Sequence, residues 1–406
     1  MPRRRPAPPP LEPLAEEPGP GRPAPKAFEG AVARAFSAAF AGLPETLPAE
    51  ELRRLAAALA RYQPGQQRLY LRNRPQARTV SLAKHLLSTA RKAVHRGAEP
   101  ARRAAEAALA TAESLPAEGP GRALRQDLRA EACAQLANAL RLNEEHSAAA
   151  ERFAEAWQLA ATGSGDPLLQ ARLGSLEASL HLERRAFSEA ERSLRTVAFL
   201  YRLLGDEPGE AQAHSKLGRT YYLAGRPEDC IAAFYRVLEL AEPAGAGGAL
   251  HVVAAQGIAH AAEDLGLFRL AFGIAQDLPP LLARHCGPLA ALRGRWLAGR
   301  LAASVGRLEL AMAELEEVRL GFLRRSLLLD ASLASLDLAW AYALRGRPDR
   351  QKRLAEEMLP VFTAHGLPQE ATAAFLLYAN AAQNYRVTRA LAEELRQRLT
   401  PLRRGG

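Results

Sequence analysis

Apolar and polar positions along most of this chain follow the spacing of amphipathic helices. In the middle of the sequence, the pattern predicts a helix from Ala211 to Ala224, a turn at Gly225-Arg-Pro227 and a second helix from Glu228 to Ala241. Similar helical stretches are separated by links rich in Gly and Pro. These links lie at Gly163 to Pro167, Gly205 to Pro208 and His285 to Pro288. The pattern therefore predicts a series of helical pairs.

The helical pairs are spaced at a nearly constant interval. A small residue in the first helix of each pair recurs in steps of 41, 40, 41, 40 and 40, at Ala137, Ala178, Gly218, Ala259, Gly299 and Ala339. Repeats of 20 to 50 residues mark units that bury their apolar face only by stacking on copies of themselves. We therefore expect an all-α solenoid, with these small residues where the paired helices cross.

The residues around Gly218 resemble the tetratricopeptide repeat. The family pattern is matched by Leu217-Gly218, Tyr221, Gly225, Cys230 and Phe234, with Cys in place of the usual Ala. Other units keep parts of this skeleton: Ala137, Ala149 and Phe153; Ala178, Ala190 and Leu194; Gly299, Gly306, Ala311 and Leu315; Ala339, Tyr342 and Gly346. The resemblance implies a right-handed α-solenoid of about six regular units, with a degenerate N-terminal unit and a C-terminal capping helical pair.

The period departs from the family pattern, whose usual unit has 34 residues. The stretch Trp296-Leu-Ala-Gly-Arg300 resembles arrays that follow helix-turn-helix domains in some bacterial regulators. No such domain is found here, because residues 28–62 are too short for its usual helices. The turn position carries Gly in the last four units but Glu144 and Arg185 in the first two, so we expect looser turns there.

The segments outside the array differ in composition. Residues 1–26 hold ten prolines in the first 25 positions and are expected to be a disordered tail. Residues 27–62 are expected to form two short amphipathic helices, over 28–41 and 49–62. Residues 63–121 form a basic segment, whose expected helices at 79–95 and 99–115 make the degenerate first repeat, and residues 122–406 form the solenoid and its cap.

The composition indicates a hydrophobic core built mainly from aliphatic residues. Apolar residues make up 48% of the chain and aromatic residues only 6%, so Ala and Leu must supply most of the core. The three cysteines lack CxxC spacing, and Cys230 stands where other units carry Ala, so it is interpreted as a packing residue. Neither a secretory signal nor a long apolar run is present, and a cytoplasmic location is expected.

The sequence carries no recognisable catalytic motif. It has no Gly-Lys pair for a P-loop and neither GxSxG nor HExxH. His260 with Glu263 offers too few ligands for a metal, and His285 beside Cys286 lies in a link. No catalytic, cofactor or metal site is therefore expected.

The expected function is protein binding in the concave groove lined by the first helices. By the resemblance, the residue after each small position, and those about one turn to either side, point into this groove: Asn138, Arg141, Ser179, Arg219, Tyr222, His260, Glu263, Trp296, Arg300 and Trp340. Arg, Asn and aromatic residues are common in binding interfaces. We expect a protein or peptide partner, while packing against neighbouring repeats is the alternative for each residue.

The net charge of +10 is concentrated in one segment. Residues 61–103 hold eleven Lys and Arg and one acid, Glu99, so this segment alone accounts for the excess. The contact residues expected here are Arg68, Arg72, Arg74, Arg78, Lys84, Arg91, Lys92 and Arg96, with Tyr62 and Tyr70 beside them. Such a cluster is suited to nucleic acid, or to an acidic protein or intramolecular partner. The alternative function is therefore a regulatory protein that acts with DNA or RNA, or with a DNA-binding partner, through residues 61–103. An ordinary solvated face is the remaining interpretation.

Overall fold

The computed structural model describes residues 47–116, 121–241 and 248–363, with residues 376, 378–382, 391 and 394 beyond them. The expected tail at 1–26 and the expected helix at 28–41 lie outside the described residues, as does most of the chain after residue 363. Within the described parts, every regular element is a helix. No helix there is long and apolar enough to cross a bilayer.

Six consecutive helical pairs form the repeat array, as the sequence pattern predicts. The pairs are α6 (Arg122–Leu142) with α7 (His146–Ala161), α8 (Pro167–Glu183) with α9 (Phe187–Leu204), α10 (Glu207–Leu223) with α11 (Pro227–Ala241), α12 (Ala249–Asp264) with α13 (Phe268–Ala275) and α14 (Leu278–Cys286), α15 (Pro288–Ser304) with α16 (Leu308–Leu323), and α17 (Leu328–Arg345) with α18 (Pro348–Thr363). The expected all-α solenoid is therefore confirmed.

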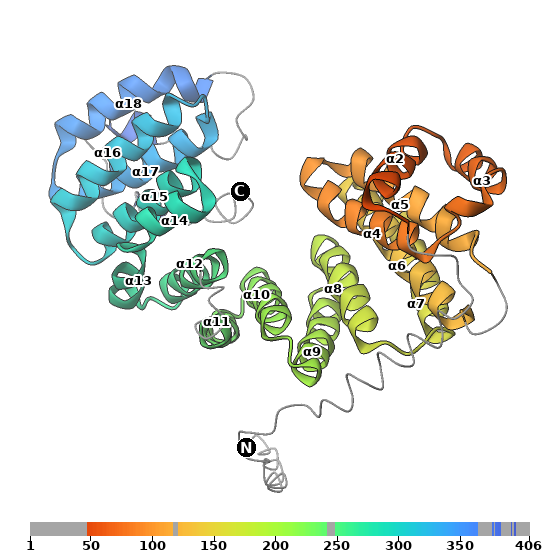
Figure 1. Ribbon diagram of the computed structural model, residues 1–406. Helices are drawn as coiled ribbons and strands as arrows, with labels where there is room; N and C mark the ends of the chain where they lie inside the picture. The colour runs from red at the N-terminus through yellow and green to blue at the C-terminus, as the bar shows by residue number, and fades with distance from the viewer. Residues whose placement is uncertain are drawn as a thin grey trace, which may run out of the picture.

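The array curves into an open arc (Figure 1). The first helices α8, α10 and α12 lie toward the inside of the arc, and the second helices α9 and α11 lie toward the outside. The N-terminal helices end one arm of the arc and α15–α18 form the other. This arrangement places one face of α8, α10 and α12 on the concave side.

The N-terminal part contains more structure than the sequence pattern predicts. It consists of α2 (Ala49–Leu59), α3 (Pro64–Arg72), η1 (Pro75–Ala77), α4 (Val80–Ala93), η2 (Val94–Arg96) and α5 (Ala98–Glu113). Between the expected helices at 49–62 and 79–95 lies the additional helix α3, which Pro64 opens because proline is well tolerated in the first turn. Leu55, Leu71 and Leu86 join α2, α3 and α4 in one core that continues into α6.

Several residues interpreted as breakers begin helices. α10 starts at Glu207 rather than Ala211, since Asp206 caps it by accepting a hydrogen bond of 2.9 Å from the backbone N–H of Gly209. Pro167 and Pro288 likewise open α8 and α15. In the fourth unit, the second helix is divided into α13 and α14, and two prolines follow the first residue of α14. Links between units are thus shorter than the Gly and Pro content indicates.

All six turns inside the repeats share one geometry. The turn residues have φ between 57° and 82°, including Glu144 and Arg185, so the expectation of looser turns in the first two units is wrong. In each turn the next backbone N–H bonds the carbonyl five residues before it, at 2.8 to 3.0 Å, from Glu145 to Leu140, Ala186 to His181, Arg226 to Tyr221, Leu267 to Ala262, Arg307 to Ala302, and Arg347 to Tyr342. This Schellman geometry imposes a left-handed residue whatever its side chain.

The small residues lie at close helix contacts. Gly218 faces the ring of Phe234, and a Cβ added at Gly218 would lie 2.7 Å from that ring. A Cβ added at Gly257 of α12 would approach the same ring more closely still. Phe234 therefore packs between two glycines of successive first helices. Cys230 is fully buried nearby, and burial raises the pKa of its thiol to about 12, which fits a packing role.

Candidate functional site: the inner face

Most residues expected to face the groove instead join neighbouring repeats. Asn138 is buried, and its Oδ1 accepts hydrogen bonds of 3.1 and 2.9 Å from the Nε and Nη2 of Arg141. Arg141 also forms an ion pair with Glu183 of the next first helix. These contacts tie α6 to α8, so this pair of residues has a structural role in the unbound protein.

The same holds for the C-terminal half of the array. Arg300 is buried and forms a 2.5 Å ion pair with Glu263 of the preceding repeat. Trp296 is buried and donates a 2.8 Å hydrogen bond to Asp337 of the following repeat. Trp340 is buried as well. Packing between repeats accounts for Trp296 and Arg300, whose partners lie about one period away in the sequence, and Trp340 belongs to the hydrophobic core.

Ser179, Tyr222 and His260 keep partial exposure on the inner helices, as do the paired Arg141 and Glu263. The rings of Tyr222 and His260, from α10 and α12, lie 6.0 Å apart and are both half-buried. Ser179 is also half-buried, and its Oγ donates to the backbone carbonyl of Ser175 at 3.3 Å. A ligand on the inner face can reach these groups without unfolding a repeat.

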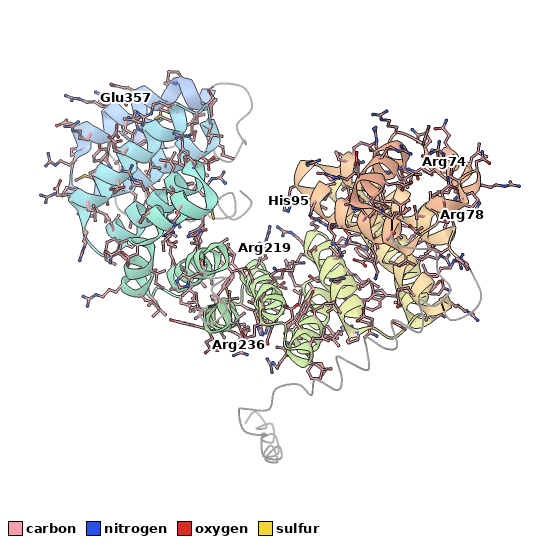
Figure 2. All side chains as sticks on the ribbon, in the orientation of Figure 1. Arg74, Arg78, His95, Arg219, Arg236 and Glu357 are labelled. Atoms are coloured by element: carbon pink, nitrogen blue, oxygen red, sulfur yellow. The ribbon has the colours of Figure 1, made fainter. Side chains whose placement is uncertain are left out.

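Among the residues expected in the groove, Arg219 is the one best placed to bind a ligand. It is exposed, and it makes no hydrogen bond or ion pair with any residue that the structure describes. Figure 2 shows Arg219 on the inner side of the arc, while Arg236 of the same repeat lies on the outer side. An exposed guanidinium at the middle of the inner face is accessible to a ligand.

One residue of the inner face was missed by the sequence analysis. Lys216 lies one turn before Arg219, on the same face of α10. Its Nζ donates to the Ser175 carbonyl at 2.6 Å, to Ser175 Oγ at 2.8 Å and to Ser179 Oγ at 3.2 Å. Burial, helped by the charge of Arg141, lowers the pKa of Lys216 to about 8. The sequence did offer a signal for Lys216, because a spacing of three residues from Arg219 places both side chains on one face of a helix.

The basic N-terminal residues do not gather into one free cluster. Arg68 pairs with Glu113 at 3.2 Å, and Arg91 pairs with Glu131. Arg78 donates to the carbonyls of Leu71 and Arg72, at 2.8 and 2.6 Å, and so caps α3. These three guanidinium groups hold the N-terminal helices together.

The remaining basic residues are spread over the N-terminal unit. Arg74 stacks on Tyr70, with its guanidinium carbon 4.8 Å from the ring centre. Arg72, Lys84, Lys92 and Arg96 are exposed. In Figure 2, Arg74 and Arg78 lie at the outer end of the arm, whereas His95 of η2, next to Arg96, lies toward the opening of the arc.

Comparison with known proteins rests on structure alone. Neither a family model nor a curated protein sequence matches this chain. A STAND protein from Pyrococcus horikoshii, with a tetratricopeptide repeat sensor, superimposes with a TM-score of 0.58 at 14% identity. The match covers 90% of this chain and 54% of that protein, so this chain spans about half its length.

Two Rap proteins are also similar in structure. The apo form of RapI superimposes with a TM-score of 0.56 at 9% identity, covering 87% of this chain and 97% of RapI. A Rap protein complexed with Competence and Sporulation Factor gives 0.51 at 14% identity, covering 79% and 92% of the two chains. Together with the repeat geometry, these matches define the class: this protein is a TPR-like α-solenoid.

Proposed function

We propose that this protein is a non-enzymatic scaffold that holds a peptide or protein segment on the inner face of its arc. The observation that carries the proposal is Arg219, an exposed cation at the middle of the inner face with no partner among the described residues. Arg is among the residues that most often dominate binding energy at interfaces. On the inner helices α8, α10 and α12, the half-buried Ser179, Tyr222 and His260 offer aromatic and hydrogen-bonding surface.

The structural neighbours add support of a general kind. One of them is a Rap protein in complex with Competence and Sporulation Factor, and another carries its repeats as a sensor. Solenoids of this kind present extended concave surfaces for binding. For this protein, we place the interaction in the cytoplasm and assign no chemistry to the repeats.

Site-specific crosslinking tests the proposal. Benzoylphenylalanine is introduced at Tyr222, one turn after Arg219 on α10, or, as the control, at Arg236 on the outer side, and the full-length protein is irradiated in its native extract. Mass spectrometry should place partner peptides at position 222 and not at position 236. Crosslinks found at position 236 alone would defeat the proposal.

Nucleic-acid binding through residues 61–103 stays a prediction of the sequence. Arg68, Arg78 and Arg91 are engaged within the fold, which leaves fewer cations for phosphate than the sequence indicates. Fluorescence anisotropy with labelled duplex DNA at low ionic strength tests it directly. If no binding is detected, or if Lys92→Gln with Arg96→Gln leaves the affinity unchanged, this alternative fails.

A further inference from the structure

A pocket of about 370 Å³ lies between α7, α8 and α9, and we refer to it as the outer pocket. The aromatic and ionisable residues in its lining are Trp157 of α7, Glu177 and His181 of α8, and Glu189 and Arg192 of α9. Ligand pockets in proteins measure about 300–1,000 Å³, so the outer pocket has room for one large side chain of a partner.

The outer pocket and the inner face use different sides of α8. Gly174, Glu177 and His181 line the pocket, and their spacing of about one helical turn puts them on one face of the helix. Ser175 and Ser179 lie on another face, where both accept hydrogen bonds from α10. Helix α9, which forms a wall of the pocket, lies toward the outside of the arc (Figure 1). The outer pocket is therefore a second candidate surface, separate from the proposed inner-face site.

Close packing of α8 against α9 fixes the shape of the outer pocket. Ser193 of α9 donates a 3.0 Å hydrogen bond to the carbonyl of Gly174. A Cβ added at Gly174 would lie only 2.9 Å from Cγ2 of Val197 and 3.9 Å from the ring of Trp157. The walls are therefore in place before a ligand arrives, which lowers the entropic cost of binding.

The two carboxylates of the outer pocket have no counter-ion among the residues that the structure describes. Glu177 Oε2 accepts a 2.9 Å hydrogen bond from the Trp157 indole, a neutral donor that leaves the negative charge in place. The carboxylate of Glu189, in the first turn of α9, is exposed and makes neither a hydrogen bond nor an ion pair within the described ranges. By contrast, Glu191 of the same helix pairs with Arg226 at 2.6 Å.

The remaining lining favours a cationic ligand, and a guanidinium in particular. Arg192 is exposed and pairs with neither carboxylate, and the two carboxylates outnumber it. Trp157 adds an indole ring, the aromatic group that attracts cations most strongly. A guanidinium is planar, donates several N–H groups and stacks on aromatic rings, so it suits this lining better than an ammonium group does.

Two large apolar side chains lie one turn apart on α9, beside the outer pocket. Phe199 is 61% exposed and Leu203 is 67% exposed, while Thr196 and Leu200 of the same helix line the pocket itself. Single exposed apolar residues are common on protein surfaces. Two of them on one helix face, next to a pocket, form a surface suited to the apolar residues of a partner.

We propose that the outer pocket binds an arginine side chain of a second protein, in a segment whose apolar residues pack on Phe199 and Leu203. Glu177 and Glu189 accept the N–H groups of the guanidinium, and Trp157 provides the aromatic wall. The proposed partner of this surface is thus a basic and partly apolar segment. It binds independently of any peptide on the inner face.

A randomised peptide library displayed on phage tests the partner class. The library is first depleted on the full-length variant Glu177→Gln with Glu189→Gln and then panned on the wild type. Gln at position 177 keeps an acceptor for the Trp157 indole, so the pocket keeps its shape. Depletion removes peptides that bind the inner face, which separates this inference from the proposed function. The surviving peptides should share an Arg with apolar neighbours, and survival of none, or of peptides without a shared Arg, would overturn the inference.

The best peptide and its analogue with citrulline in place of Arg are then titrated against the wild type and single variants. The Arg peptide should bind roughly tenfold more tightly than the citrulline analogue, because only the former carries a charge. Glu177→Gln should remove most of this preference, and Arg192→Gln should tighten the Arg peptide roughly twofold by removing a like charge. The control Glu151→Gln changes an exposed acid of α7 outside the pocket and should have no effect. Equal affinities for the two peptides would refute the arginine assignment.

A second measurement examines the outer pocket without any peptide. The tryptophan indoles are labelled with ¹⁵N, the Trp157 signal is assigned from Trp157→Phe, and N-acetyl-arginine methylamide is titrated at constant ionic strength. We expect a saturable shift of the Trp157 signal and none for the buried Trp296 and Trp340. A Trp157 signal that does not shift, or that shifts equally with the citrulline compound, contradicts the proposed site.

Discussion

The indole Nε1 of Trp296 donates a 2.8 Å hydrogen bond to Oδ2 of Asp337, one repeat further along the chain. Both side chains are buried, and Arg300 adds a favourable charge near the same carboxylate. The ring of Trp296 also meets Phe322 edge to face, with centroids 5.7 Å apart. A residue expected from the sequence to bind a ligand thus connects α15 to α16 and α17.

Trp296→Phe is expected to destabilise the protein by about 1–3 kcal/mol, because the buried Asp337 carboxylate loses a donor. Urea denaturation gives the change in the free energy of unfolding. In a double-mutant cycle with Asp337→Asn, the two changes should be coupled. Additive effects would show that the hydrogen bond contributes nothing to stability.

Gly218→Leu is expected to destabilise the protein by about 1–3 kcal/mol or more, because the new side chain collides with the buried ring of Phe234. Gly273 is the matched control: it is an exposed helical glycine with open space around its Cβ position. Gly273→Ala should stabilise the protein by about 0.5–1 kcal/mol. Thermal denaturation of both variants checks the contrast, and similar effects at the two sites would refute it.

Glu144→Gly and Arg185→Gly should each stabilise the protein by up to about 1 kcal/mol. Both residues have left-handed φ, at 61° and 57°, where a Cβ is unfavourable. The gain is partly offset by the greater freedom of glycine in the unfolded chain. Gly225→Ala, at φ 72° with open space around it, should change stability in the opposite direction. Chemical denaturation that shows one sign for all three variants would contradict this account.

Lys216→Met should stabilise the unbound protein at pH 7. The expected gain is roughly 1–3 kcal/mol, reduced by the contribution of the hydrogen bonds that the variant loses. The pKa of Lys216 is about 8 in the fold and 10.5 when unperturbed, so the unfolded chain binds more protons between these values. Wild-type stability from this group therefore rises with pH across that window. The advantage of the variant should shrink above pH 8 and end near pH 10.5.

Urea denaturation at several pH values measures this difference. Lys92→Met serves as the control, because Lys92 is an exposed lysine of α4. A difference between Lys216→Met and wild type that stays constant from pH 7 to pH 10.5 would show that the ammonium group is not penalised by its surroundings.

Much of the fold could be predicted from the sequence because each repeat is built from helices and turns that local residue patterns specify. The small residues at Ala137, Gly218 and Ala339 are buried at helix contacts, and the turn residues all have the left-handed conformation. Helical spacing and the closing turn depend on residues within a few positions of each other, which a sequence displays directly. The wrong expectation for Glu144 and Arg185 arose because side-chain identity was used, whereas packing of the paired helices imposes the turn.

The candidate site was less accessible to sequence reasoning. The sequence by itself predicted the first helices of the repeats, and the resemblance implied that their Arg, Asn and aromatic residues lie on the inner side. Only the tertiary structure decided which of them are free. That choice depends on contacts 37 to 42 residues apart, such as Arg141 with Glu183 and Lys216 with Ser179. The rotation between successive repeats sets these distances, burying Trp296 and Arg300, exposing Arg219 and leaving Lys216 without a counter-ion.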